Sequence, residues 1–128
     1  MMNLLFSFQG RLNRAKWWLI NIGAGVVEMI VFAVLFGGTA MMTMADPDQA
    51  IAAMSGINAV IVVIVSVIAF WISLSVAVRR FHDRNKSGWW VLIVLVPVIG
   101  GLWYLIECGF LRGTAGPNNY GPDPLSAL

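Results

Sequence analysis

The distribution of charges along this chain limits its possible folds more than any motif. No lysine or arginine occurs between Lys16 and Arg79, and that stretch contains only three acidic residues. Residues 17–36 carry a single charge, and residues 57–78 carry none. An apolar helix of about 20 residues is about 30 Å long, which matches the hydrocarbon core of a bilayer. We therefore expect two membrane-spanning helices in these two runs.

Composition excludes several other classes of protein. The chain is 59% hydrophobic and 11% charged, whereas soluble domains average about 45–50% and about 25%. A mean hydropathy of +0.83 also excludes intrinsic disorder, which requires low hydrophobicity and high net charge. The net charge of +2 does not suggest a nucleic-acid partner, which usually binds a basic stripe on a soluble scaffold. A single cysteine, Cys108, cannot form an intrachain disulfide.

A third apolar run covers residues 89–106 and is interrupted by Pro97, Gly100 and Gly101. Two interpretations are open: one span bent at these residues, or a re-entrant hairpin whose two arms each cross half of the bilayer. We expect the bent span. The predicted fold is an all-α integral membrane protein with one domain, residues 1–128, and three transmembrane helices. A short interfacial N-terminal helix and an irregular tail rich in Gly, Pro and Asn complete it.

The basic residues predict the orientation in the membrane. Seven of the eight precede the first span or lie between the second and third, whereas residues 37–56 contain two aspartates and no basic residue. The positive-inside rule therefore predicts a cytoplasmic N-terminus. A signal peptide cleaved near Gly38 or Ala40 is an alternative, but about 20 apolar residues with an internal glutamate exceed a normal signal sequence.

Three polar segments carry a family resemblance. They are FSFQGRLNRAKWW at residues 6–18, RRFHDRNKSGWW at residues 79–90 and GTAGPNNYGPDP at residues 113–124. In this order and spacing they resemble the bacterial domain-of-unknown-function family 805 over nearly the whole chain. The resemblance implies a small multi-span protein of the bacterial inner membrane and implies no biochemical activity. Glu28 and the methionine-rich loop lie outside this resemblance.

The basic segments contain the residues that we expect to bind anionic lipid headgroups or a partner protein, because each cation near the membrane surface contributes about 1 kcal/mol. We expect Asp83 to accept hydrogen bonds from a neighbouring arginine, and Ser87 to begin the third apolar helix. The candidate binding residues are Arg11, Arg14, Arg79, Arg80, His82, Asp83, Arg84 and Lys86.

His82 next to Asp83 also has the chemistry of a general acid and base, which would suit a membrane enzyme acting on lipid. However, the sequence has no recognisable serine elbow and only one histidine, so neither a nucleophile nor a zinc site accompanies the pair. We therefore expect no catalytic residue, no metal and no cofactor.

Glu28 lies near the middle of the first span, where a charge costs at least about 2.5 kcal/mol. Asn21 lies two turns earlier on the same helix face. In one interpretation Glu28 is protonated and hydrogen-bonded to Ser66, Ser73 or Ser75 of the second span. In another it belongs to a proton or cation relay, and in a third the span is displaced so that Glu28 reaches an interface.

Two further segments have distinctive chemistry. The tail consists of turn-forming residues, and we expect it to fold back onto the polar loops through Asn118, Asn119, Tyr120 and Gly121; binding of a partner would leave the same pattern. The loop containing Met41, Met42 and Met44 has soft Cu(I) ligands, but without a histidine we expect flexible apolar packing.

The sequence therefore predicts a non-enzymatic inner-membrane protein with a basic cytoplasmic face that binds anionic headgroups or a partner protein. Three helices leave much surface uncovered, so we expect association with itself or with a larger membrane complex, through the small residues Gly23, Ala24 and Gly25 of the first span. The alternative is an oligomeric channel or proton-linked transporter in which Glu28 from several copies lines a path.

Overall fold

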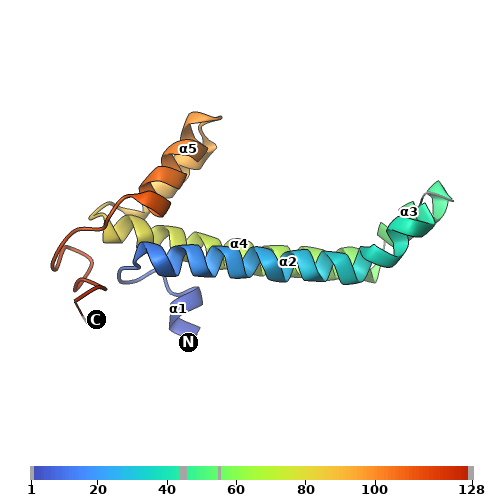
Figure 1. Cartoon of the computed structure of the whole chain (residues 1–128), viewed down its shortest axis with the longest axis horizontal. Coiled ribbons are helices and arrows are strands. Elements are labelled where there is room, and N and C mark those ends of the chain that lie inside the picture. The colour runs from blue at the N-terminus through green and yellow to red at the C-terminus, as the bar shows by residue number, and fades with distance from the viewer. Residues whose placement is uncertain (1, 44–45, 55, 127–128) are drawn as a thin grey trace. The chain divides into compact units, whose positions relative to one another are not determined.

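The computed structural model describes residues 2–43, 46–54 and 56–126, and these residues form helices and no strand (Figure 1). The predicted all-α fold is confirmed in this part of the chain. The helices are α1 (Met2–Phe6), α2 (Arg14–Thr43), α3 (Pro47–Met54), α4 (Ile57–Asp83), the 3-10 helix η1 (Gly88–Leu95), α5 (Ile99–Leu105) and the π-helix η2 (Ile106–Phe110).

The chain divides into two compact units, and α2 and α4 each contribute to both. The first, Met1–Asn21 with Trp71–Leu128, contains all eight lysines and arginines and is called here the basic unit. The second, Ile22–Phe70, contains no lysine, arginine or histidine and is called the apolar unit.

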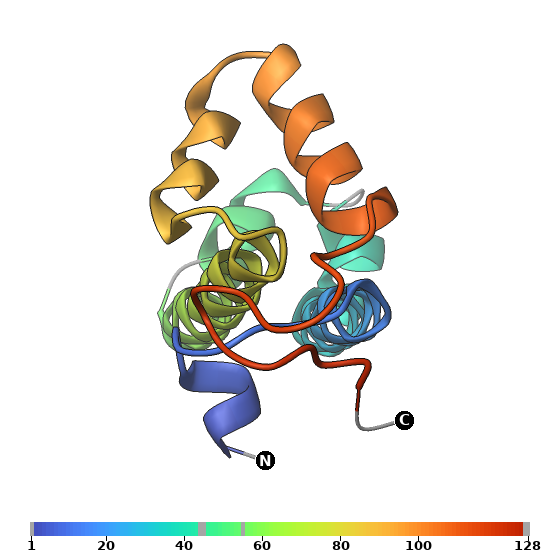
Figure 2. The same ribbon diagram turned by 90° about the vertical axis from the view of Figure 1, so that its left-hand side faces the viewer.

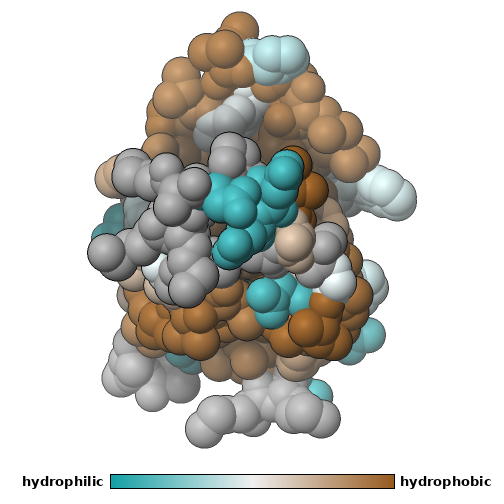
Figure 3. Space-filling view, turned by 90° about the vertical axis from the view of Figure 1, so that its right-hand side faces the viewer, coloured by the Kyte–Doolittle hydropathy of each residue, from teal (hydrophilic) through white to brown (hydrophobic). Residues whose placement is uncertain are grey.

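Two helices have the length and hydropathy of membrane spans. They cover Arg14–Gly37 and Ile57–Asp83, which agrees with the two apolar runs of the sequence. Their apolar side chains are widely exposed, for example Val34 at 76% and Ile57 at 71%. So much exposed apolar surface is unfavourable in water but suits a lipid environment. Figure 3 shows hydrophobic surface over much of the visible face, with a hydrophilic patch near α3, whose exposed residues include Asp48 and Gln49.

Local hydrogen bonds fix the polar ends of these two helices. The Oδ1 atom of Asn13 accepts a hydrogen bond from the amide of Lys16 at 2.9 Å, which is the geometry of an N-cap at the start of α2. At the end of α4, Asn85 has a φ of +57°. The amide of Lys86 donates to the carbonyl of Phe81, and that of Asn85 to His82. This is a Schellman motif, in which asparagine takes the left-handed position.

The basic unit has a small hydrophobic core at the same end of the helices. Its buried members are Leu12, Trp17, Val76, Phe81 and Cys108. They come from the loop before α2, from both long helices and from η2. The core therefore joins the two spans to the segments that precede and follow them.

The third apolar segment is a helical hairpin, so the expectation of a single bent span over residues 89–106 is wrong. η1 and α5 pack against each other, and Figure 2 shows them as two adjacent arms joined by a turn. Glu107, beyond the second arm, forms an ion pair with Lys86, before the first arm. Each arm has the length of about half a bilayer core, and three full spans are not confirmed.

The residues that were expected to bend a span instead form the hairpin turn. Pro97 lies shortly after η1, and its backbone carbonyl accepts a hydrogen bond from the amide of Ile99. Val98, the residue between them, has a φ of +64°. Such a three-residue turn reverses the chain in the smallest possible space. Gly100 then allows close approach, because a Cβ atom there would overlap the carbonyl oxygen of Ile93 in the opposite arm.

The expected N-terminal helix is present as α1. Ser75 and the guanidinium of Arg79 donate to the backbone carbonyls of Leu5 and Leu4, respectively. Gly10, with a φ of +83°, lies in the turn that leads to α2. Its location at the membrane interface remains a prediction.

The hairpin predicts that substitution of two neighbouring glycines changes the stability of the protein to different extents. Gly100→Ala should destabilise the protein by about 1–3 kcal/mol, the usual cost of overpacking, because the new methyl group meets Ile93. Gly101→Ala is the matched control, since nothing lies within 4 Å of a Cβ atom there. Unfolding in mixed micelles would measure both variants, and equal stability of the two would contradict the hairpin.

Candidate functional site

The centre of the basic unit is a buried carboxylate held by two arginines. The Nε atom of Arg11 donates to one oxygen of Asp83 at 3.0 Å, and the Nη1 atom of Arg80 donates to the other at 2.6 Å. The side chains of Arg11, Arg80 and Asp83 are 1%, 0% and 5% exposed. The prediction that Asp83 accepts from a neighbouring arginine is confirmed, while the bond from Arg11, 72 positions away, was not expected.

The same two guanidinium groups also donate to backbone carbonyls of η2 and of the segment after it. The remaining nitrogens of Arg11 donate to the carbonyls of Thr114 and Gly116. Arg80 donates to the carbonyls of Cys108 and Leu111. Backbone carbonyls thereby accept hydrogen bonds from the N–H groups that do not bind Asp83, so that these buried donors are paired.

The tail completes the network from the other side. The side-chain amide of Asn118 donates to the backbone carbonyl of His82 at 2.9 Å. The ring of Tyr120 stacks on the ring of His82, with centroids 4.0 Å apart. The backbone amide of Asn119 donates to Asn85, and Gly121 pairs with Asn118. The predicted return of the tail onto the polar loops is therefore confirmed (Figure 2).

Two other carboxylates stabilise the same unit. Glu107, 5% exposed, accepts from Arg84 at 2.9 Å and from Lys86 at 2.8 Å. Burial alone would raise the pKa of Glu107, but the hydrogen bonds from Lys86 and Arg84 outweigh it and lower the pKa below its ordinary value. The pKa of Asp123 is also lowered, because the backbone amides of Leu125 and Gly116 donate to it.

The side chains of His82 and Asp83 have different partners in this arrangement. The Nδ1 atom of His82 lies 3.1 Å from the carbonyl oxygen of Gly10, whereas the carboxylate of Asp83 is held by Arg11 and Arg80. His82 also borders an apolar groove of about 470 Å³ that includes Ser87. Ser87 caps η1 by accepting from the amide of Trp89, as expected.

The burial of three arginines corrects their predicted contact with lipid headgroups. Arg11 and Arg80 are enclosed in the network, and Arg79, 4% exposed, donates to the carbonyls of Asn3 and Leu4. Their role is to hold the fold. Arg84 and Lys86 are partly exposed and paired with Glu107. The exposed basic residues are Arg14, Lys16 and Arg112, of which Arg14 also donates to the carbonyl of Phe110.

The intramembrane polar residues lie apart from this network. The side-chain amide of Asn21 donates to the carbonyl of Trp17 in its own helix. Glu28 lies in the apolar unit, where it lines a hollow with Ser66, one of its three predicted partners. Ser75 instead donates to Leu5 and Ile72. The methionine-rich loop stays untested, because Met44 and the side chains of its neighbours lie outside the described residues.

Sequence reasoning missed several residues of the network. Glu107 carried a usable signal, because it is the only charge near the end of the third apolar run and a basic loop precedes that run. Gly113 is also required, since a Cβ atom there would overlap the carboxylate of Asp83. The backbone carbonyls that accept from Arg11 and Arg80 have no signal in a single sequence.

These features define a class: a small helical membrane protein whose polar segments fold into one arginine-rich unit. The chain belongs to the family described as protein of unknown function (DUF805), whose model matches residues 5–122. It is 32% identical over 118 residues to the inner membrane protein YhaH of Escherichia coli strain K12, covering 92% of this chain and 87% of the relative. Inner membrane protein YhaI of that strain is 29% identical over 120 residues, with 92% and 86% covered. No solved structure matches the chain.

The family match includes the segments that form the network. All three polar segments of the network fall largely within the matched residues, and the relatives are inner membrane proteins. The chain is therefore a protein of the bacterial inner membrane, consistent with its two long apolar helices.

The network predicts an unequal effect of two carboxylate substitutions. Asp83→Asn should destabilise the protein by about 3–5 kcal/mol, because it leaves two buried guanidinium groups without their counter-ion. Glu107→Gln should cost less, since Arg84 and Lys86 are each more than a quarter exposed and water can solvate them. Thermal unfolding in detergent would rank the two, and the reverse order would contradict the central role of Asp83.

Proposed function

We propose that the protein is a non-enzymatic inner-membrane protein whose basic unit faces the cytoplasm and binds the headgroups of anionic phospholipids. The observation that carries the proposal is a hollow of about 230 Å³ in the basic unit, lined by the exposed residues Arg14 and Arg112. Guanidinium groups bind phosphate oxygens with two parallel hydrogen bonds. Two guanidinium groups that line the same hollow could together bind a phosphate diester.

The surroundings of this hollow favour an anion. It lies at the first turn of α2, a helix of 30 residues, whose N-terminus favours negative charge. Asp83 also lines the hollow, but its charge is compensated by Arg11 and Arg80. The local balance, four arginines and the N-terminal dipole of α2 against the carboxylates of Asp83 and the nearby Asp123, is positive.

Exposed tryptophans in the same unit support a headgroup rather than a free anion. Trp89 and Trp90, at the start of the hairpin in the same unit, are 77% and 43% exposed. Exposed tryptophans are enriched at the boundary between headgroups and hydrocarbon. A phosphate bound by Arg14 and Arg112 would thus belong to a lipid of that boundary.

The orientation follows from the division of charge between the units. All lysines and arginines belong to the basic unit, whereas the loop region of the apolar unit contains Asp46 and Asp48 and no cation. The positive-inside rule then assigns the basic unit, with the N-terminus, the loop after α4 and the tail, to the cytoplasm.

Lipid binding predicts a stabilisation that depends on two arginines. Phosphatidylglycerol added to the detergent-purified chain should raise its melting temperature more than phosphatidylcholine does, since a ligand of the folded state stabilises it. Arg14→Gln with Arg112→Gln should abolish this difference. Lys16→Gln, an exposed cation that does not line the hollow, is the control. An unchanged difference in the double variant would reject the proposal.

Self-association and transport are the other functions to be tested. Nothing lies within 4 Å of a Cβ atom placed at Gly23 or Gly25, so another helix could approach α2 there. A channel or proton-linked transporter is supported by the hollow beside Glu28. It predicts proton flux in proteoliposomes that Glu28→Gln abolishes without changing the oligomeric state, and absence of flux in the unmodified protein would reject it.

A further inference from the structure

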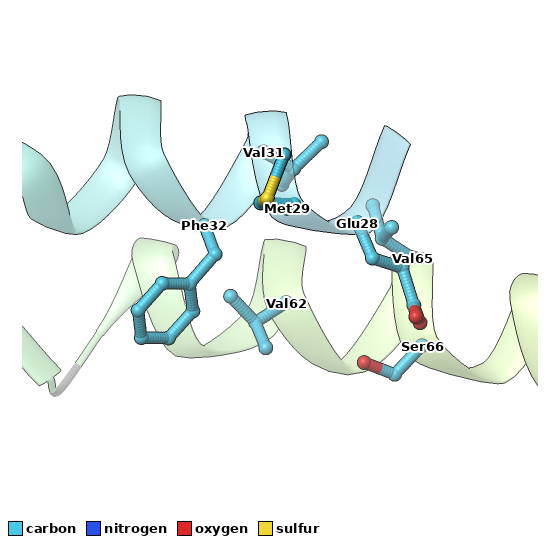
Figure 4. A pocket seen from close by; sticks show the side chains of 7 residues that line it. All are labelled: Glu28, Met29, Val31, Phe32, Val62, Val65 and Ser66. Carbon is cyan, nitrogen blue, oxygen red and sulfur yellow. The ribbon is translucent and has the colours of Figure 1, made fainter. Parts of the chain in front are cut away.

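The hollow in the apolar unit has a polar end and an apolar end. It has a volume of about 330 Å³ and lies between α2 and α4 (Figure 4). The carboxyl group of Glu28 and the hydroxyl group of Ser66 lie at one end, and the ring of Phe32 lies at the other. The lining residues are Glu28, Met29, Val31, Phe32, Val62, Val65 and Ser66.

The charge of Glu28 has no counter-ion within this unit. Residues 22–70 contain no lysine, arginine or histidine. A charged side chain within a membrane span is neutralised by a proton, an ion or an opposite charge. Because the unit's own chain supplies no opposite charge, either a proton or a cation from outside must neutralise the carboxylate.

The walls of the hollow select the kind of cation. A metal ion such as Ca²⁺ requires six or more oxygen ligands, and only Glu28 and Ser66 contribute side-chain oxygens here. The rest of the lining is aliphatic, thioether or aromatic, and Phe32 offers a ring face of the kind that attracts organic cations. A volume near 330 Å³ is also within the range of small-molecule sites.

The hollow is accessible from the surface of the helix pair. Met29 and Phe32 are 65% and 60% exposed, and Ser66 is also exposed. In a membrane span this surface borders the lipid, so a ligand would enter from the bilayer. A hydrophilic cation is scarce there, whereas a cation with an apolar body partitions into it.

We propose that this hollow binds a lipophilic organic cation, whose charge is paired with the carboxylate of Glu28 and whose apolar body contacts Phe32 and Met29. The proposal does not depend on headgroup binding by the basic unit, since different residues carry it.

Tetraphenylphosphonium is a suitable probe, because it is permanently charged and apolar. Equilibrium dialysis of the full chain in dodecylmaltoside at pH 8 should show saturable binding above that of empty micelles. Glu28→Gln should weaken it at least about tenfold, because a charged partner is lost. Asp48→Asn removes an exposed carboxylate of the same unit and should leave binding unchanged.

A neutral analogue separates a site from partition into the micelle. Triphenylphosphine oxide lacks the positive charge and should bind Glu28→Gln and the unmodified protein equally weakly. Circular dichroism would verify that Glu28→Gln is folded. If it is not, the unmodified chain is the test: tetraphenylphosphonium should bind it saturably and triphenylphosphine oxide should not.

The proposal is overturned by tetraphenylphosphonium binding that is not saturable. It is equally overturned by binding that Glu28→Gln leaves intact, or by triphenylphosphine oxide that binds the unmodified protein as saturably as the cation does. Because lipid stabilisation is measured with Arg14 and Arg112 and this binding with Glu28, failure of one leaves the other standing.

Discussion

The fold of the basic unit depends on one buried carboxylate between two guanidinium groups. Asp83 and Arg80 belong to α4, while Arg11 precedes α2, so the interaction ties both long helices together. Charges enclosed in this way are favourable only when they are paired and their remaining hydrogen-bonding groups are satisfied. Carbonyls of η2 and of the segment after it satisfy them, and both are thereby fixed in place.

This arrangement explains why a tail without apolar periodicity has a defined conformation. Residues 113–124 are mostly glycine, proline, asparagine and aspartate, and they could not bury enough hydrophobic surface to order themselves. Hydrogen bonds to buried arginines and the stacking of Tyr120 on His82 supply the order instead. The polar segments that carry the family resemblance are therefore mainly folding determinants, and only a few cations remain at the surface.

The sequence was informative for features that depend on the length of an apolar run and on whether lipid or water surrounds it. Two apolar runs of about 20 residues, which contain only one charged residue, leave few alternatives to membrane helices, and turn-forming residues in the tail exclude another helix. It could not distinguish a cation that binds a carbonyl of its own chain from one that faces lipid headgroups, because both follow the same pattern of arginines beside an apolar run. Arg79 and Arg80 were misjudged for this reason, and the partners of Arg11 lie about 70 to 110 positions away.

The hairpin shows how one charge can decide between two topologies. Pro97 and Gly100 permit either a bend or a reversal, so they alone do not determine the topology. Glu107 favours the reversal, because a full span would separate it from Arg84 and Lys86 by the thickness of the bilayer and leave three charges without partners. In the hairpin all three are paired at one end. An acidic residue after a broken apolar run, with a basic loop before that run, is thus an argument for a reversal in related sequences.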